Sequence, residues 1–336
     1  MKRIVVHQFG DSDQLQLHEL DTPAPGRGEV LIRVTAIGVN YADIMARRGQ
    51  YKLVSGEPPF TPGLEAGGVI EAVGEAVPAS RIGERATLSL QAPRGAGVGT
   101  YADHYVCPSA DAITVPPGVP DDQLGSLWLT YLTAWSCLIH TQGLQPGTIV
   151  GLPAASSGVA LAAAQIVRAH GGTTIGLTTS PGKVEQIEAL PHSSFDHIVV
   201  TAGKEGAWGF DLKALTNKHG IDVFFDPVAA GAYLDTEIKS LAKYGTIWVY
   251  GLLGQTGPVD VTPLIRKHAA IRGWSVAEFA ATEPEAAARG YQHILDRMAD
   301  GSYAQHIHRR FPLADAADAH TYMEQSSHIG KIILQP

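Results

Sequence analysis

Seven small or hydroxyl residues join an apolar segment, predicted to be a β-strand, to an Ala-rich segment of helical length: Ala154, Ala155, Ser156, Ser157, Gly158, Val159 and Ala160. The free N–H groups and the dipole at the start of a helix favour negative charge, and small side chains let a phosphate approach the backbone. Of the three fingerprint glycines of dinucleotide-binding turns only Gly158 is present, and many strand-to-helix turns contain small residues. We expect Ser156, Ser157, Gly158 and Val159 to bind a pyrophosphate.

The next predicted strand ends roughly 20 residues after this turn, where dinucleotide sites distinguish NAD from NADP. An Asp or Glu there accepts hydrogen bonds from the ribose 2′-hydroxyl of NAD but repels the 2′-phosphate of NADP. The sequence instead has Thr178, Thr179, Ser180 and, after a Pro-Gly pair, Lys183. Hydroxyl groups and an ammonium suit a phosphate, so we expect NADPH as the cofactor. The alternative is that Lys183 is a solvated side chain in the first turn of a helix.

The sequence contains no residue spacing typical of a metal site. Its two cysteines, Cys107 and Cys137, are expected to be buried apolar residues and not part of a disulfide framework or a zinc cage. The fourteen histidines include no H-E-x-x-H motif. His104 and Cys107 come closest to a ligand pair, but their segment alternates as a strand does, which favours a structural role.

The chain has two parts that differ in their pattern of predicted strands and helices. Residues 1–120 are predicted to be β-rich, with one helix at residues 41–48 that Asn40 caps. From about residue 123 apolar strands alternate with helical segments, which is typical of a doubly wound parallel sheet, and the tail is expected to rejoin the N-terminal part. The six predicted parallel strands are residues 148–154, 173–179, 197–201, 221–228, 245–251 and 270–276.

The length and net charge of the chain limit the number of domains and the kinds of partner that it can have. Single cores seldom exceed roughly 250–300 residues, so a chain of 336 residues is expected to form two domains. These are a dinucleotide-binding domain at residues 123–275 and a β-rich domain at residues 1–122 and 276–336. The net charge of −8 argues against a dedicated nucleic-acid binder. No apolar run approaches the roughly 20 residues of a membrane span, and the N-terminus resembles a strand more than a signal peptide, so we expect a cytoplasmic protein.

Eight segments form an ordered series along nearly the whole chain: GVNYADIMARRGQY (38–51), PFTPGLEAGGVIEAVGEAV (59–77), GTYADHYV (99–106), LTYLTAWSCL (129–138), PAASSGVALAAAQIVRAHGG (153–172), DVFFDPV (222–228), GTIWVYGLLG (245–254) and FPLADAADAHTYMEQSSHIGKIIL (311–334). In this order they resemble the zinc-free quinone oxidoreductases of the medium-chain dehydrogenase/reductase superfamily. The resemblance implies an α/β fold with a doubly wound Rossmann domain and a β-rich, GroES-like barrel that is the catalytic domain. It also implies NADPH-dependent reduction of quinones or other conjugated carbonyl acceptors.

The same resemblance assigns the catalytic residues. Zinc-dependent relatives have a Cys at the position of Asn40, followed by an Asp at that of Asp43, and a four-Cys lobe that this chain lacks. Hydride transfer without a Lewis acid is easiest to an acceptor that is already electrophilic. Asn40 is expected to hydrogen-bond a carbonyl or a ribose hydroxyl, and Tyr51 to orient the substrate or supply a proton. Their structural alternatives are a helix cap for Asn40 and a packing aromatic for Tyr51.

Further expectations concern the cofactor and the surroundings of the site. Thr133, with Tyr131 near it, would line the cofactor side, and Gly251, Leu252 and Leu253 would cover the nicotinamide. Ala160 departs from the family's third glycine, and an aromatic residue is missing near residues 201–202. The shape of the substrate pocket depends on two loops, at residues 91–99 and 277–285. Residues 270–276 are expected to form the edge strand of a homodimer.

Two alternatives for the function stay open. An enoyl or 2-alkenal reductase of the same fold would carry the same motifs. A non-catalytic structural or RNA-binding protein that retains NADPH belongs to another class, and the acidic charge weighs against RNA.

Overall fold

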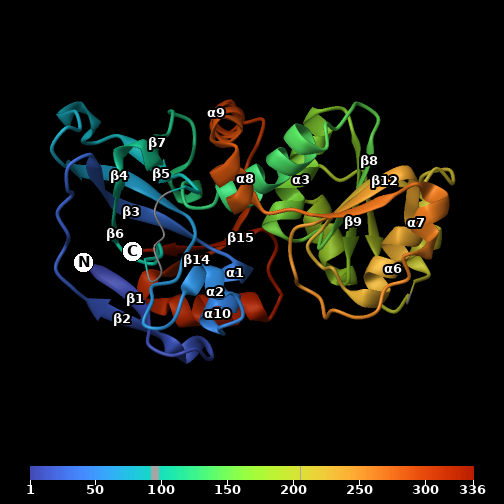
Figure 1. Cartoon of the computed structure of the whole chain (residues 1–336), viewed down its shortest axis with the longest axis horizontal. Helices are drawn as coiled ribbons and strands as arrows, with labels where there is room; N and C mark the ends of the chain where they lie inside the picture. Colours follow the sequence, from blue (N-terminus) through green and yellow to red (C-terminus); the bar gives the residue numbers. More distant parts are fainter. Residues whose placement is uncertain (92–97, 205) are drawn as a thin grey trace. The chain divides into compact units, whose positions relative to one another are not determined.

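The computed structural model describes residues 1–91, 98–204 and 206–336. The chain divides into two units, of which the first comprises Met1–Leu132 with Ala280–Pro336 and the second Thr133–Phe279 (Figure 1). Residues 92–97, in the loop expected at 91–99, lie outside the described residues. Within the described residues, no helix is long and apolar enough to cross a membrane.

The first unit is organised around one long strand, β3 (Glu29–Val39), which is buried along most of its length. It pairs antiparallel with β4, β6 and β15, and the sheet of the described residues has the order β14-β15-β3-β4-β5-β7. Strands β1 and β2 form a separate antiparallel pair. The other strands of this unit are β1 (Lys2–Val6), β2 (Leu15–Glu19), β4 (Ala66–Val73), β5 (Arg85–Leu88), β6 (His104–Pro108), β7 (Ala112–Thr114), β14 (Ile307–Pro312) and β15 (Lys331–Gln335).

Close backbone packing at the end of β3 requires a glycine. A Cβ atom on Gly38 would lie 2.2 Å from the carbonyl oxygen of Gly125 and 2.6 Å from Oε1 of Glu65. Both distances are far below van der Waals contact, so any side chain would push the backbone or Glu65 away. The glycine therefore lets Glu65 lie directly beside the residues that follow β3.

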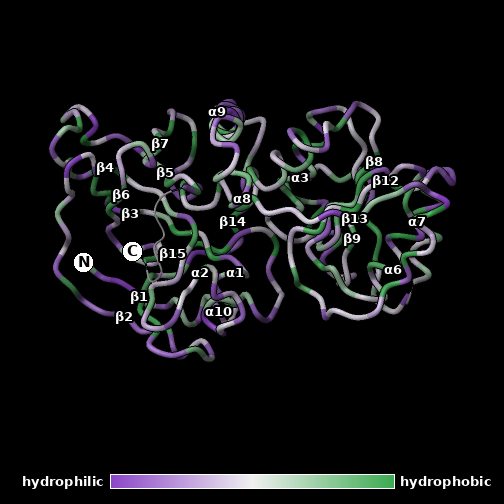
Figure 2. The backbone as a smooth tube through the Cα atoms, in the orientation of Figure 1, coloured by the Kyte–Doolittle hydropathy of each residue, from purple (hydrophilic) through white to green (hydrophobic). Residues whose placement is uncertain are grey.

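The C-terminal tail adds two strands and two main helices to the first unit. Strand β15 pairs with β3 so that Ile332 lies opposite Val39, and β14 runs parallel to β15. Helix α9 (Pro284–Ala299) buries residues three or four positions apart, among them Ala287, Tyr291 and Ile294, so it shows both hydrophobic and hydrophilic colours in Figure 2. Helix α10 is Ala316–Glu324.

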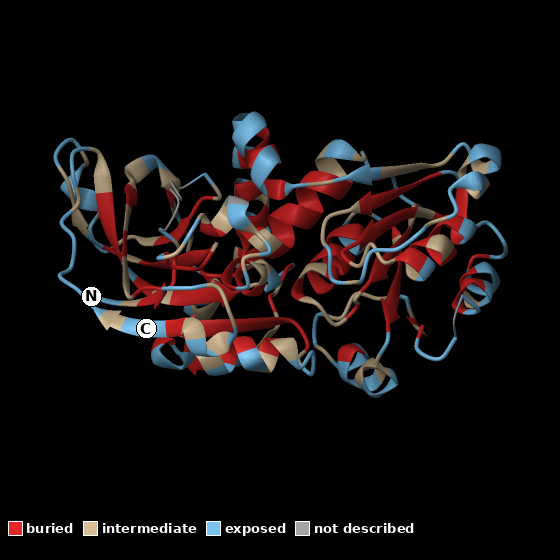
Figure 3. Ribbon diagram, turned by 60° about the horizontal axis from the view of Figure 1, so that its bottom comes forward, coloured by how far each residue is buried: buried red, intermediate tan, exposed pale blue. Residues whose placement is uncertain are grey.

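The second unit contains a six-stranded parallel sheet in the order β10-β9-β8-β11-β12-β13. Numbered along the chain, this is the order 3-2-1-4-5-6 of dinucleotide-binding sheets, with its switch point between β8 and β11. The six predicted strands and the doubly wound fold class are confirmed. Figure 3 shows the strands of this unit as largely buried. They are β8 (Ile149–Pro153), β9 (Thr173–Thr178), β10 (His197–Val200), β11 (Ile221–Asp226), β12 (Leu241–Val249) and β13 (Ala270–Gly273).

The remaining helices include three features that the sequence did not predict. Two π-helical stretches, Trp128–Leu132 and Trp135–Thr141, flank Thr133. Residues 277–285, expected as a loop, are largely helical instead, because their Ala-rich sequence has no turn-forming residue before Pro284. The other helices are α1 (Tyr41–Arg47), α2 (Lys52–Ser55), α3 (Gly158–Ala169), α4 (Val184–Glu188), α5 (Trp208–Leu215), α6 (Gly231–Ser240), α7 (Thr262–Lys267) and α8 (Val276–Thr282), with short 3₁₀ turns at Ser12–Gln14, Ala79–Arg81, Ser109–Asp111, Asp121–Gln123, Pro181–Lys183 and Leu313–Asp315.

A pair of buried carboxyl groups lies between β11 and α6. Asp226 accepts hydrogen bonds from the N–H groups of Val228 at 2.6 Å and Ala229 at 2.9 Å. Glu237 is fully buried, and among the described residues its two carboxyl oxygens have no hydrogen-bond partner, while the charge of Asp226 acts on it. The backbone N–H groups favour an ionised Asp226, whereas burial without a partner favours the protonated form of Glu237. Burial, and then the charge of Asp226, raise the pKa of Glu237 well above its ordinary value of 4.5.

The Glu237→Gln variant is expected to be more stable than the wild type at neutral pH. A raised pKa means that the contribution of Glu237 to stability is complete below pH 4.5 and is lost as the pH rises through the folded-state value. The loss is about 1.4 kcal/mol for each pH unit in that window, and a neutral amide avoids it because it does not ionise. Urea unfolding at pH values from about 5 to 8 measures the free energy of unfolding of both proteins. The wild type alone should lose stability with the slope expected for the release of about one proton.

The control for this comparison is Glu185→Gln, because Glu185 is exposed on α4. That variant should follow the wild type at every pH. A stability difference between Glu237→Gln and the wild type that stays constant with pH would show that Glu237 does not hold the extra proton.

Candidate functional site

The turn between β8 and α3 has the geometry of an anion-binding helix start. Ser157 caps α3 by accepting the N–H of Ala160 on its Oγ at 3.1 Å. The N–H groups of Gly158 and Val159 belong to the first helical turn, where they have no carbonyl partner within the helix. Although Ala160 replaces a glycine, it is buried and α3 still contacts β8 and β9. The turn therefore offers a cap, two N–H groups and the hydroxyl of Ser156 to a bound phosphate.

The end of β9 brings a cation to the same turn. Nζ of Lys183 donates a hydrogen bond to Oγ of Ser156 at 3.3 Å, and burial lowers the pKa of Lys183. Thr178 is buried, and its Oγ1 accepts the N–H of Ser180 at 3.1 Å, so it shapes the turn. Thr179 is exposed. No acidic residue occurs between Thr178 and Lys183, and the donors present fit a phosphate.

Gly251, Leu252 and Leu253 follow β12 at the edge of the sheet where the strands end. Because the strands are parallel, this edge also carries the turn after β8 and the end of β9. Leu252 is 56% exposed and Leu253 42% exposed, which leaves two large apolar side chains on the surface of this unit. The N–H of Leu253 donates to the carbonyl of Pro227 at 2.8 Å, which fixes the segment to the end of β11.

Sequence reasoning missed Tyr250, although its motif GTIWVYGLLG also contains the predicted residues Gly251, Leu252 and Leu253. Its ring stacks on Phe225 with the centroids 4.0 Å apart, and the side chain of Ser157 is near enough to its hydroxyl to affect its pKa. Burial, and then the charge of Asp226, raise the pKa of Tyr250 well above its usual value, so the hydroxyl stays protonated. Tyr250, directly after β12, thus lies near the cap of α3.

Thr133 and Tyr131 lie on or beside the π-helical stretches. Thr133 is buried between the two stretches, and its carbonyl accepts the hydroxyl of Ser136 at 3.4 Å. Tyr131 is fully buried in the first unit, where it stacks on Tyr303 with the centroids 5.4 Å apart. π-Helical turns are rare and occur often at functional sites, but no sequence pattern used above predicts them.

In the first unit Asn40 begins α1, as the sequence predicted, and its side chain is also part of a polar cluster. Its backbone N–H donates to Oδ2 of Asp43 at 2.9 Å. Its Nδ2 donates to the carbonyl of Gly38 at 3.1 Å and to Oε1 of Glu65 at 3.2 Å, and its Oδ1 accepts from Nζ of Lys331 at 2.7 Å. Glu65 and Lys331 were not among the predicted site residues. The quoted motifs contain both, but only the pairing of β15 with β3 brings them together.

Asp43 links this cluster to a second buried group. Its Oδ2 accepts from the hydroxyl of Tyr101 at 3.3 Å, and the same hydroxyl lies 2.9 Å from Nε2 of His320. Burial raises the pKa of Asp43 to about 7, although the N–H of Asn40 and the charge of Lys331 act against it. Burial, and then the charge of Arg47, lower the pKa of His320 to about 3, so its ring is neutral.

Tyr51 lies at the start of α2, in the helical pair that connects β3 to β4. Helices α1 and α2 contact each other, so Asn40 and Tyr51 both stand at helix starts in one connection. The side chain of Tyr51 is half-buried, and no described residue hydrogen-bonds its hydroxyl. A hydroxyl in this state can bind a ligand or a solvent molecule.

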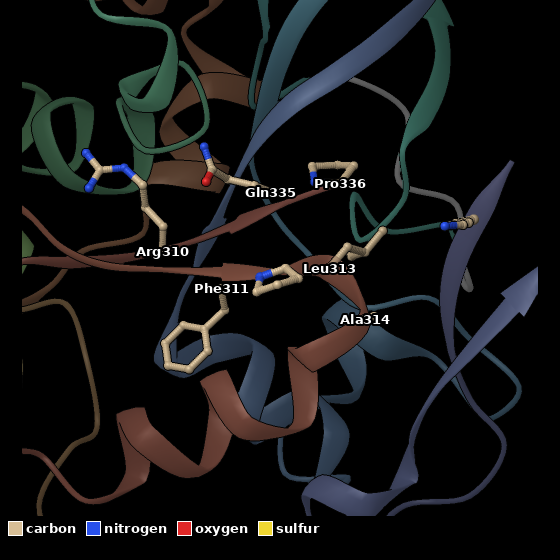
Figure 4. Close-up of a pocket in the computed structure, with 8 residues that line it drawn as sticks. Arg310, Phe311, Leu313, Ala314, Gln335 and Pro336 are labelled. Carbon is tan, nitrogen blue, oxygen red and sulfur yellow. The ribbon is translucent and has the colours of Figure 1, made fainter.

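His104 and Cys107, for which the sequence favoured a structural role, and a surface hollow lie elsewhere in the first unit. His104 hydrogen-bonds the carboxylates of Asp103 at 2.8 Å and Glu71 at 3.0 Å, and burial raises the pKa of the Cys107 thiol to about 12. Among the described residues no group of three or more His, Cys, Asp or Glu is placed to hold a metal ion. A hollow lined by Lys2, the segment Arg310 to Ala314 and the C-terminal residues contains no predicted site residue (Figure 4).

Each of the two units contains residues that match a known protein family. The model of the alcohol dehydrogenase GroES-like domain matches residues 26–117, and that of the zinc-binding dehydrogenases matches residues 158–291. The quinone oxidoreductase of Lama guanicoe is 33% identical over 99% of this chain and 97% of its own. The synaptic vesicle membrane protein VAT-1 homolog of Rattus norvegicus is 28% identical over 100% of this chain and 84% of its own.

The chain is also similar to a reductase that is named for a different substrate and to a solved structure. A 2-haloacrylate reductase from a Burkholderia species is 30% identical over 99% of this chain and 98% of its own. The crystal structure of Escherichia coli quinone oxidoreductase complexed with NADPH superposes with a TM-score of 0.87, at 25% identity over 100% of both chains. The chain therefore belongs to the medium-chain dehydrogenase/reductase superfamily, with quinone oxidoreductase-like relatives, and it is an oxidoreductase with a GroES-like domain and a Rossmann domain.

Proposed function

We propose that the protein reduces quinones or other conjugated carbonyl compounds with NADPH, without zinc. The observation that carries the proposal is the bond between Lys183 and Ser156, which joins a cation to the helix start at the edge where parallel strands end. Ligands of doubly wound sheets bind at this edge. The similarity to a quinone oxidoreductase complexed with NADPH supports the same cofactor.

The residues of the second unit would hold the cofactor by its charged end. Ser156, Ser157, Gly158 and Val159 would bind the pyrophosphate with hydroxyl and N–H groups, next to Tyr250. Lys183, with the hydroxyls of Thr179 and Ser180, would bind the 2′-phosphate as charge-assisted donors. Leu252 and Leu253 would cover the nicotinamide and exclude water. When bound, NADPH supplies the hydride.

The residues of the first unit would orient the acceptor and supply a proton. The hydroxyl of Tyr51 can donate to the carbonyl oxygen that becomes the hydroxyl of the reduced product, with water as the alternative donor. Asn40, in place of a zinc-binding Cys, leaves the acceptor to supply its own electrophilicity, which a conjugated carbonyl does. Most of the rate enhancement would then come from positioning.

One observation favours a second candidate, a reductase of activated carbon–carbon double bonds. The 2-haloacrylate reductase that this chain resembles over 99% of its length is named for such a substrate. Enones and quinones share an electrophilic carbon conjugated to a carbonyl, so the same positioning groups would serve both.

The proposed dimer would form at β13, which is an edge strand of the sheet in the described residues.

Lys183→Ala is expected to weaken NADPH binding by about 10- to 100-fold, because a charge-assisted hydrogen bond to the phosphate is lost. NADH binding should change little, since NADH lacks that phosphate. Fluorescence titration with both cofactors measures the change. Lys243→Ala is the control, because Lys243 is exposed at the start of β12. Equal losses for NADPH and NADH would mean that Lys183 does not bind the 2′-phosphate.

Tyr51→Phe is expected to lower kcat by about 100-fold with quinones while NADPH binding stays unchanged, because only the proton donor is removed. Steady-state rates with a panel of quinones and enones give kcat for each acceptor. Tyr41→Phe is the matched control, since Tyr41 lies in the same connection and is exposed. An unchanged kcat would assign the proton to water. Turnover of enones alone would establish the second candidate, and turnover of neither class would refute both.

A further inference from the structure

We propose that Lys331 is a positioning residue that holds the amide of Asn40 in one orientation, so that Asn40 acts only as a hydrogen-bond acceptor in the active site. The inference rests on the proposed function, in which Asn40 contacts the cofactor or the acceptor. It depends on the hydrogen-bond chemistry of three side chains in the first unit, Asn40, Glu65 and Lys331. We call these three the clamp.

The partners of Asn40 allow only one orientation of its amide. An ammonium can only donate, so the oxygen of Asn40 must face Nζ of Lys331, 2.7 Å away. The carbonyl of Gly38 and the carboxylate of Glu65 can only accept, so the NH₂ group must face them. Rotating the amide by 180° would place two donors together and two acceptors together. The buried ion pair therefore fixes which atom of Asn40 faces each neighbour.

The clamp uses every donor that it contains. Nζ of Lys331 donates to the carbonyl of Val39 at 3.0 Å, to Oδ1 of Asn40 at 2.7 Å and to Oε1 of Glu65 at 2.9 Å, which accounts for its three protons. Both protons of the Asn40 amide are also bound. The other oxygen of Glu65 accepts the N–H of Leu129 at 3.1 Å. The side chains of Lys331 and Glu65 are 5% and 1% exposed, so water does not compete with these bonds.

The fold brings the clamp together from three distant segments. Ile332 lies opposite Val39 in the antiparallel pairing of β15 with β3, which places Lys331 next to Asn40. Gly38 lets Glu65 approach, since a Cβ atom there would lie 2.6 Å from Oε1. Gly330 has φ of +79°, and a Cβ atom there would lie 2.3 Å from the carbonyl of His306, so the chain can enter β15 only with glycine at this position.

The clamp limits what Asn40 can do in the reaction. Its NH₂ group has no proton left to donate to the carbonyl of a substrate, whereas Oδ1 keeps one lone pair beside the bond from Lys331. The partner of Asn40 is therefore a donor, such as a ribose hydroxyl or the carboxamide NH₂ of a nicotinamide. Of the two roles expected from the sequence, the clamp selects the contact with a hydroxyl and not the one with a carbonyl.

The test is a double-mutant cycle on NADPH binding, measured by fluorescence titration. The clamp variant Lys331→Met/Glu65→Gln removes both charges together, so no unpaired charge is left buried. We expect it to weaken NADPH binding about tenfold, the effect of one lost hydrogen bond, and Asn40→Ala to do the same. Because Lys331 acts through Asn40, adding the clamp substitutions to Asn40→Ala should change the affinity less than about twofold.

Independent effects, with about a further tenfold loss in the combined variant, would overturn the proposal, because a merely structural role for Lys331 would be additive. A wild-type protein that does not bind NADPH would refute the proposed function instead, so the two failures can be told apart. Thermal unfolding shows whether each variant is folded.

Asn40→Asp provides a second test if the clamp variant does not fold. Its added oxygen would face the carboxylate of Glu65 and the carbonyl of Gly38, with Asp43 also near and Lys331 as the cation. We expect NADPH affinity in this variant to fall as the pH rises and to recover at low pH, where the introduced carboxylate is protonated. Affinity that matches the wild type across the pH range would show that the orientation of the amide does not matter.

Discussion

The pairing of β15 with β3 is the interaction on which the first unit depends. It puts a lysine from the end of the chain against the residue that begins α1, and the ammonium bonds the backbone of β3 as well as two side chains. A buried ion pair contributes little net stability unless all its hydrogen bonds are made, because both charges must leave water. Here they are made, so the pair determines the arrangement of neighbouring groups more than it stabilises the fold.

A different constraint builds the second unit. In a parallel sheet every strand ends at the same edge, so segments far apart in sequence meet there without any contact that the sequence must encode separately. The turn after β8, the end of β9 and the segment after β12 meet for this reason. Lys183 then bonds Ser156 of the turn, and Tyr250 lies near Ser157. Residues that follow two different strands thus come next to neighbouring hydroxyls of the turn.

The sequence predicted the elements better than their contacts. Hydrophobic periodicity and turn residues are local, and they were enough for six strands, the helix after Asn40 and the Rossmann fold. Two partners of the Asn40 side chain come from residues 65 and 331, and the raised pKa of Glu237 depends on burial, so neither feature has a local signal. The π-helical stretches around Thr133 also lack one. At residues 277–285 the prediction of a loop is wrong although a local signal exists, because the Ala-rich sequence there favours the helix that forms.

The clamp also bears on the proposed preference for a conjugated acceptor. A metal ion activates a carbonyl by accepting electron density from its oxygen, and a donor amide could do part of the same work. Asn40 has no free proton to donate, and the three protons of Lys331 are equally bound. Carbonyl activation in the first unit would therefore fall to Tyr51, whose hydroxyl bonds no described residue. A phenol is a weak acid, so a single hydrogen bond from it favours acceptors whose reduced form is stabilised by their own conjugation.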